Sequence, residues 1–155
     1  MTIPPISAHV NRIYLKKLED LDDALELMYF GLKGLTRDAD DLLATYGLSR
    51  AHHRILFVIA RHEGIDVGTL IAALGVTKQA ANRPMRRLFE GCFVAATREP
   101  GRHRNKTLHL TQLGRDVERK ASDCERAVMR AAFERAGKDG RKAWSRVMSA
   151  VAERA

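Results

Sequence analysis

The chain has 155 residues, of which 45% are hydrophobic, and it carries a formal net charge of +8. This length supports one good hydrophobic core, and the apolar content favours an ordered protein over a disordered one. No apolar run approaches the roughly 18 residues that a membrane span needs, and the N-terminal segment lacks the basic and apolar regions of a signal peptide. Cys92 and Cys124 have no metal-type spacing and are too few for a disulfide framework. We therefore expect a cytoplasmic protein that does not enter the membrane.

The N-terminal part of the chain is predicted to be helical. Apolar residues recur in steps of three and four from Tyr14 to Tyr46, which is typical of an amphipathic helix. We expect Gly31 and Gly34 to bend or break this helix and Thr36 to cap its restart. The stripe is longer than one small core requires, so part of it should pack against a second chain.

The middle of the chain has the pattern of a helix-turn-helix. Ser49 is placed to cap a helix over residues 50–62, and a short helix over 66–74 and a further helix over 78–90 follow. Gly75 lies in the turn between the last two helices, where a left-handed backbone is required. Proteins with this arrangement of helix, tight turn and helix place one helix in the major groove of DNA.

A basic hairpin and a long helix come next. Residues 93–97 and 107–110 are predicted to be β-strands, and the loop that joins them is rich in arginine and lysine. A basic hairpin in this position is typical of the wing of a winged helix-turn-helix. Thr111 is placed to cap a long helix, and Gly137 and Gly140 are expected to separate that helix from a last one.

Together these elements predict a mostly α fold, a winged helix-turn-helix with a two-stranded β wing and an N- and C-terminal helical dimerisation region. Residues 47–115 hold 12 basic and four acidic residues, whereas residues 1–46 hold five basic and eight acidic ones. A basic excess concentrated in this way is the electrostatic footprint of a phosphate-binding surface. We divide the chain into an N-terminal helical dimerisation region (1–46), a DNA-binding domain (47–111) and C-terminal dimerisation helices (112–155).

Four sequence blocks carry a resemblance to a known family. They read LSRAHHRIL from Leu48, VGTLIAALGVTKQA from Val67, RRLFEGCFV from Arg86 and LTQLGR from Leu110. In their order and spacing the chain resembles the MarR family of bacterial winged-helix repressors. The resemblance implies a homodimer, built from the N- and C-terminal helices, that binds pseudo-palindromic double-stranded DNA as a sequence-specific transcription regulator, here expected to be a repressor. It also implies release from DNA by a small-molecule effector, often phenolic or otherwise aromatic, in a cleft between the two parts.

The chain departs from the family pattern at three places. The wing of the family usually carries Asp-x-Arg, and residues 102–104 here read Arg-His-Arg, so the arginine is kept without its acidic partner. Pro84 lies inside the predicted recognition helix and cannot donate a hydrogen bond to the carbonyl of Ala80, which predicts a kink or an irregular turn. Cys92 replaces the glycine that is usual before the first wing strand, so a positive φ there would be strained.

The residues expected to contact DNA lie on the polar face of the helix over 78–90 and in the wing. Arg and Lys can bind guanine O6 and N7, and Asn and Gln can form bidentate hydrogen bonds with adenine, whereas the wing cations would hold phosphate or the minor groove. Arg87 and Arg98 are candidates for intramolecular pairs instead. Any one of these residues could equally well be polar because it lies on a solvated helix surface. For the set as a whole, DNA contact is the better explanation. The set comprises Thr77, Lys78, Gln79, Asn82, Arg83, Arg86, Arg102, Arg104 and Lys106.

Tyr29, His53 and Arg54 are the predicted polar contacts of the effector, because an arginine beside a histidine and a tyrosine suits an aromatic carboxylate. Two explanations of the adjacent histidines His52 and His53 stay open. They can contact an effector or a metal ion, or His53 can pack where relatives carry an aromatic residue while His52 bonds a nearby backbone group. Adjacent helical residues diverge by about 100°, and the chain has no HExxH or CxxC motif, which disfavours a metal site.

Two alternative functions remain at this stage. The first is a metal-responsive DNA-binding regulator, in which His52, His53 and an N-terminal carboxylate hold zinc. The second is an architectural protein that binds DNA irrespective of its sequence. An enzyme is not expected, because the chain has no Walker-type phosphate loop, no GxSxG and no kinase motif. No cofactor is expected either.

Overall fold

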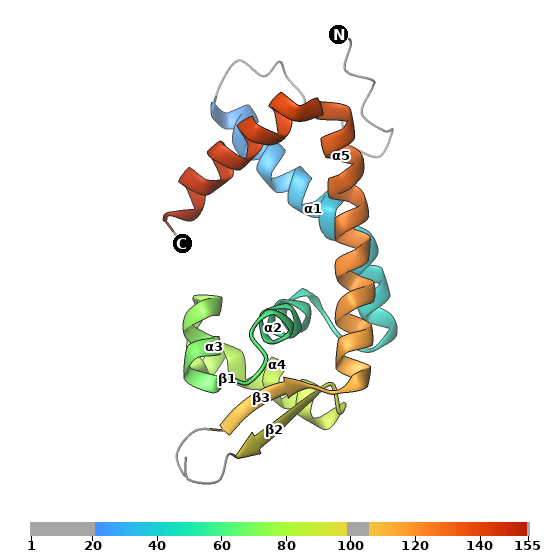
Figure 1. The fold of residues 1–155 in the computed structure, drawn as a ribbon, viewed down its shortest axis with the longest axis vertical. Coiled ribbons are helices and arrows are strands. Elements are labelled where there is room, and N and C mark those ends of the chain that lie inside the picture. The colour runs from blue at the N-terminus through green and yellow to red at the C-terminus, as the bar shows by residue number, and fades with distance from the viewer. Residues whose placement is uncertain (1–20, 99–105, 155) are drawn as a thin grey trace. The chain divides into compact units, whose positions relative to one another are not determined.

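The computed structural model describes residues 21–98 and 106–154. The chain divides into two compact units, residues 1–35 and residues 36–155. The described elements are mostly helical with one small antiparallel sheet, as predicted (Figure 1). No helix in these ranges is long and apolar enough to cross a membrane. In chain order the elements are α1 (Leu21–Thr45), α2 (Arg50–Arg61), β1 (Ile65–Asp66), α3 (Val67–Leu74), α4 (Lys78–Glu90), β2 (Val94–Arg98), β3 (Lys106–Leu110) and α5 (Gln112–Ala152).

The two helices of the helix-turn-helix begin at side chains that cap them. The Asp66 carboxylate accepts a hydrogen bond from the backbone N–H of Thr69 at 3.0 Å and so caps α3. The Thr77 hydroxyl accepts one from the backbone N–H of Ala80 at 3.1 Å and so caps α4. Between the two helices Gly75 has a φ of 63°, a conformation that glycine adopts without steric cost. The predicted helix, turn and helix are therefore confirmed.

Among the described residues the sheet has three strands, in the order β1-β3-β2, which are the two strands of the predicted wing and one further strand, β1. β2 and β3 pair antiparallel along their whole length, which confirms the predicted hairpin with its ends shifted by one residue. β1 has two residues and pairs with Leu108 and Thr107 of β3. So short a strand produces no alternating pattern in a sequence, and for this reason it was not predicted.

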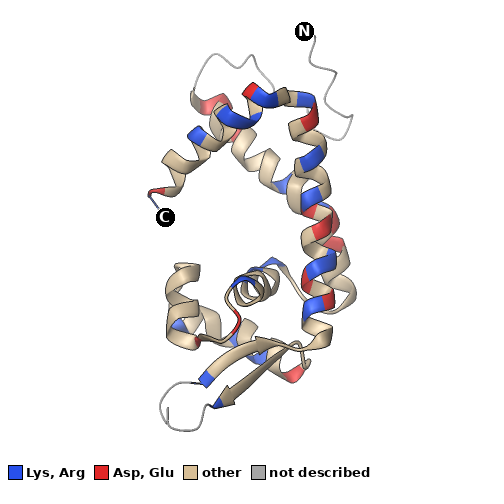
Figure 2. Cartoon of the chain, viewed as in Figure 1, with Lys and Arg blue, Asp and Glu red and all other residues tan. Residues whose placement is uncertain are grey.

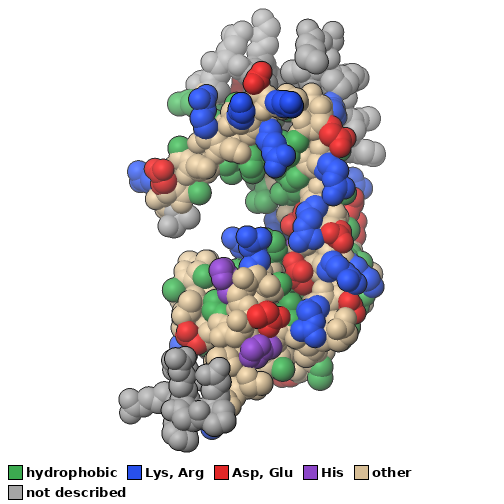
Figure 3. Space-filling view, in the orientation of Figure 1, with side chains coloured by type: hydrophobic (Ala, Val, Ile, Leu, Met, Phe, Trp, Pro, Cys, Tyr) green, Lys and Arg blue, Asp and Glu red, His purple; other side chains and the backbone are tan. Residues whose placement is uncertain are grey.

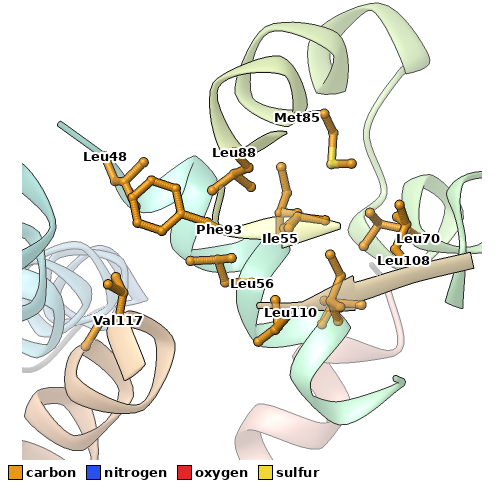
Figure 4. Close-up of a cluster of buried hydrophobic side chains, with 14 of the residues drawn as sticks. Leu48, Ile55, Leu56, Leu70, Met85, Leu88, Phe93, Leu108, Leu110 and Val117 are labelled. Atoms are coloured by element: carbon orange, nitrogen blue, oxygen red, sulfur yellow. The ribbon is translucent and has the colours of Figure 1, made fainter. Parts of the chain in front are cut away.

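The core lies around α2, which contacts α3, α4, α5 and β3. Leu56 of α2 is fully buried, together with Leu70 of α3, Leu88 of α4 and Leu108 of β3 (Figure 4). Burying one such side chain is worth about 1.5–3 kcal/mol. Because α4 and the hairpin pack on the same core, the recognition helix and the base of the wing have a fixed relation to each other.

The glycines of α1 do not interrupt it. α1 runs as one helix through Gly31 and Gly34, so the predicted break at these residues is wrong, and the alternative of a bend stays a prediction. Thr36 caps no restart, because it is buried and its hydroxyl donates a hydrogen bond to the Asp40 carboxylate at 3.2 Å. A glycine costs a helix interior about 1 kcal/mol relative to alanine, and the leucines and other good helix formers around these two offset that cost.

The C-terminal helix changes direction at one of the two glycines that were predicted to interrupt it. Gly137 has a φ of 72° and a ψ of −177° inside α5, and the chain bends in this part of the helix (Figure 1). These backbone angles belong to a region that is essentially restricted to glycine. α4 continues to Glu90 past Pro84, so the proline does not end the helix, and the predicted kink stays a prediction.

Candidate nucleic-acid interface

α4 has an apolar inner face and a polar outer face. Ala81, Met85 and Leu88 are buried and follow one another at steps of four and three, as expected for the core side of an amphipathic helix. Phe89, which periodicity would place on the inner face, is exposed, so that expectation is wrong. The residues of α4 and its cap that were predicted to contact DNA are all exposed, and the structure brings them together on the outer side: Thr77, Lys78, Gln79, Asn82, Arg83 and Arg86.

Arg87 anchors the C-terminal end of α4 to the rest of the fold. Its Nη2 donates a hydrogen bond to the carbonyl oxygen of Tyr46 at 3.0 Å. The central carbon of its guanidinium lies 5.9 Å from the centre of the Phe93 ring, a distance at which a cation and an aromatic face attract each other. The prediction that Arg87 serves an intramolecular contact is confirmed, because its guanidinium contacts Tyr46 and Phe93 within the protein.

The wing lies only partly within the described residues. Arg102 and Arg104 fall between residues 98 and 106, outside them, so their predicted roles stay predictions. Lys106 begins β3 and is exposed, and its direct partner across the hairpin is Arg98. Figure 2 shows basic residues at the ends of β2 and β3 that meet the wing loop. Arg98 is exposed as well. It was not among the predicted DNA contacts, and only the antiparallel register of the two strands shows that it lies beside Lys106.

A chain of polar contacts connects the base of the wing to the segment before β1. The hydroxyl oxygens of Thr97 and Thr107 are 2.9 Å apart, and Thr107 Oγ1 is 3.2 Å from His109 Nε2. His109 Nδ1 lies 3.2 Å from Glu63 Oε2. These contacts cross both strands of the hairpin, so they hold the base of the wing in one position on the domain.

Cys92 adopts a backbone conformation that favours glycine. Its φ is 56°, and it is the non-glycine residue with a positive φ in the described part of the chain. Its carbonyl oxygen accepts a hydrogen bond from the Thr111 hydroxyl at 2.6 Å, which holds the turn in place. A left-handed residue with a side chain costs about 1–2 kcal/mol. The strain that was predicted from the replacement of a glycine is therefore present.

Comparison with known proteins decides the family. The model of the MarR family matches residues 46–104. The HTH-type transcriptional regulator PetP from Rhodobacter capsulatus is 38% identical over 133 residues, which cover 86% of this chain and 80% of PetP. The chain belongs to the MarR family. It is therefore a DNA-binding transcription regulator of the winged helix-turn-helix type.

Solved structures of MarR-family proteins share the fold. A crystal structure of MarR is 24% identical, with a TM-score of 0.66 over 84% of this chain and 96% of that chain. A structure of CouR, described as a transcriptional repressor bound to a 23-mer DNA duplex, is 21% identical, with a TM-score of 0.68 over 86% of this chain and 93% of that chain. These likenesses confirm the predicted mostly helical winged architecture.

The adjacent histidines of this MarR-family chain serve separate contacts within the fold. His52 Nδ1 accepts a hydrogen bond from the backbone N–H of Ser49 at 2.9 Å, so the interpretation that His52 bonds a nearby backbone group is confirmed. His53 is buried, with Nε2 3.1 Å from the hydroxyl oxygen of Ser122, which in turn donates to Glu118 at 2.6 Å. Within residues 21–98 and 106–154 no group of three His, Cys, Asp or Glu is arranged as metal ligands. The zinc site of the metal-responsive alternative thus has no support among these residues.

Burial determines the charge of His53. The loss of water around the imidazole lowers the pKa of His53 below its ordinary value of 6.5, although the carboxylates of Glu125, Glu118 and Asp40 act in the opposite direction. Glu125 Oε1 is 3.6 Å from Nδ1. Because Ser122 donates its proton to Glu118, its oxygen is left to accept one, which assigns the proton of the neutral ring to Nε2.

We expect mild acid to destabilise the protein through His53. The unfolded chain binds a proton at this residue near pH 6.5, whereas the folded chain binds it only at lower pH. The stabilisation is therefore complete above that value and is lost as the pH falls through the folded pKa. Glutamine keeps an amide that can donate to Ser122 but does not titrate. The fall in Tm between about pH 7.5 and about pH 5 should consequently be smaller for His53→Gln than for the wild type, and equal falls would exclude His53 as the cause.

The predicted effector residues belong to both compact units. Tyr29 lies in the first unit, where it lines an open pocket of about 500 Å³ together with Leu25 and Lys33. Arg54 lies in the second unit and is exposed, with its guanidinium carbon 5.7 Å from the centre of the Phe57 ring. A cleft shared by Tyr29, His53 and Arg54 stays a prediction.

Proposed function

We propose that this regulator is a homodimeric repressor that binds a pseudo-palindromic operator with α4 and the wing. The observation that carries the proposal is the exposed polar face of α4, whose side chains project from the side opposite the core. Arg83 and Lys78 suit the acceptors of guanine, and Asn82 and Gln79 suit adenine. The wing cations, of which Lys106 lies in the described range, suit phosphate or the minor groove.

The proposal of a pseudo-palindromic operator is tested by selecting the sequences that the protein binds from a random pool of DNA duplexes. Two copies of α4 related by a two-fold axis would read half-sites whose centres lie one helical turn apart, about 10–10.5 base pairs. Recovery of an inverted repeat with this spacing supports the proposal. A protein that binds all sequences with equal affinity would instead be an architectural DNA binder.

Exposed apolar side chains on the terminal helices support the homodimer. Leu25 and Leu32 of α1 are 67% and 52% exposed, and Val147 of α5 is 61% exposed. In the space-filling view hydrophobic side chains remain visible between the basic ones along the last part of α5 (Figure 3). Large exposed apolar surfaces on helices are typical of faces that pack on another chain. We infer that residues 1–46 and 112–155 form the dimer interface, and a monomeric mass in sedimentation would contradict this.

We infer further that a small aromatic acid releases the DNA, with Tyr29, His53 and Arg54 as its polar contacts. The Arg54 guanidinium is exposed and suits a carboxylate. A preference of about 3 kcal/mol for a dimer that does not fit DNA would shift the equilibrium more than a hundredfold. Aromatic acids are screened for thermal shift and DNA release with wild type, His53→Ala and Tyr29→Phe. A ligand that acts equally on all three proteins contradicts the assignment of this site.

A further inference from the structure

The base of the wing carries two cations directly opposite each other. In the antiparallel register of β2 and β3, Arg98 is paired with Lys106, and both side chains are exposed. Directly opposed residues have Cβ atoms about 4.5–5.5 Å apart, and like charges in such a pair destabilise the hairpin. An anion bound between them would remove this repulsion.

The two cations lie on the side of the hairpin that faces the core. Side chains alternate along a strand, so Arg98 lies on the same side of β2 as Val94, and Lys106 lies on the same side of β3 as Leu108. Val94 and Leu108 are buried in the core that also receives Leu88 from the inner face of α4. The two cations therefore lie on the sheet face that packs with the recognition helix, just beyond the edge of the core.

Contacts on the other side of the hairpin hold the strands in register beside the two cations. Thr97 and Thr107, each next to one of the cations in sequence, are joined through their hydroxyls, and His109 extends this chain to Glu63. Glu63 is also 3.9 Å from Arg115 Nη1. The backbone on which the cations are mounted is thus fixed before any ligand binds, which lowers the entropic cost of binding.

We propose that Arg98 and Lys106 together bind one phosphate of the DNA backbone at the base of the wing. The planar guanidinium can donate two parallel N–H bonds to phosphate oxygens, and the ammonium can donate a third. The single negative charge of the phosphate lies between the two cations and offsets their mutual repulsion. Such a contact positions the wing on the duplex without reading bases. The inference rests on the proposed DNA contact of α4 and the wing, and it adds Arg98 to that surface.

The test measures binding to the selected operator and to random duplex DNA over a series of salt concentrations. Arg98→Gln should weaken both complexes about tenfold at low salt and reduce the slope of log Kobs against log salt in part, with base preference unchanged. The double variant Arg98→Gln/Lys106→Gln should lower the slope further, to a total loss of about 1 for each wing on the DNA and not about 2, because both cations serve a single phosphate. Lys120→Gln removes the same charge from an exposed position on α5 and serves as the matched control.

A second measurement separates binding from folding. Without DNA and at low salt, Arg98→Gln should have an unchanged or higher Tm, because an opposed pair of like charges is removed. Arg98→Lys keeps the charge and should keep the salt slope. The phosphate site is overturned if Arg98→Gln behaves like the Lys120→Gln control, changes base preference, or binds more weakly only together with a lower Tm. A wild-type protein that binds no DNA would contradict the proposed function itself.

Discussion

Alanine at Gly114 is expected to lower the free energy of unfolding by about 3 kcal/mol or more. A Cβ at this position would lie 2.0 Å from the carbonyl oxygen of Phe93, far inside the contact distance of the two atoms. That oxygen already accepts a hydrogen bond from the backbone N–H of Thr111 at 3.1 Å, and the Thr111 hydroxyl, which donates to Cys92, lies 3.2 Å from it. Thr111 also caps α5 through the backbone N–H of Gly114 at 3.0 Å. Neither backbone can therefore retreat without breaking the junction between the hairpin and α5.

For a chain of this length the expected loss corresponds to a fall in Tm of roughly 6–12 °C, which circular dichroism or calorimetry measures directly. Gly34→Ala is the matched control, because Gly34 also lies inside a helix but an added Cβ meets nothing within 4 Å. Alanine there should raise the free energy of unfolding by about 0.5–1 kcal/mol. A Gly114→Ala protein as stable as wild type would contradict the close approach to Phe93, and a destabilised Gly34→Ala protein would contradict an uninterrupted α1.

Local signals predicted the helical elements because the interactions that define them are close in sequence. Thr77 and Thr111 cap their helices through N–H groups three residues further along, and Gly75 has the left-handed backbone that its place in the turn requires. Glycine alone was a weaker signal. Gly34 lies within an unbroken helix, whereas Gly137 interrupts one. A glycine lowers helix stability by only about 1 kcal/mol, so the neighbouring residues and the packing decide whether the helix breaks.

Contacts between distant segments account for what the sequence did not predict. The packing of His53 was one of the two explanations open from the sequence, but its contact with Ser122 of α5 was not predicted, and the position of Arg98 beside Lys106 depends on the register of the hairpin. Neither relation has a signature in composition or periodicity. The outer face of α4 could be predicted, because helical spacing alone separates it from the buried positions. Phe89 was misplaced because the inner face of α4 is narrower than periodicity suggests.

The double replacement of Asn82 and Arg83 by alanine is expected to cost the operator complex about 2–6 kcal/mol for each half-site. The basis is that one bidentate contact to a base contributes about 1–3 kcal/mol of discrimination. Both side chains are exposed, whereas Leu88 on the inner face of α4 is fully buried. Truncation should therefore leave the core intact and change the free energy of unfolding by no more than about 0.5 kcal/mol. Fluorescence anisotropy with the operator measures the first quantity, and thermal unfolding measures the second.

The loss should be much smaller on random DNA, because a non-specific complex is held by phosphates and not by base edges. Lys106→Ala provides the contrast. As a phosphate contact, Lys106 should affect operator and random DNA by similar factors and reduce the salt dependence of both. Equal losses on the two DNAs for the Asn82→Ala/Arg83→Ala protein would show that these residues touch the backbone, and base reading would then fall to other positions of the same face, such as Lys78 and Gln79. Because sequence is read only at base edges and through DNA shape, the ratio of the two affinities decides whether the outer face of α4 reads the operator or only holds its backbone.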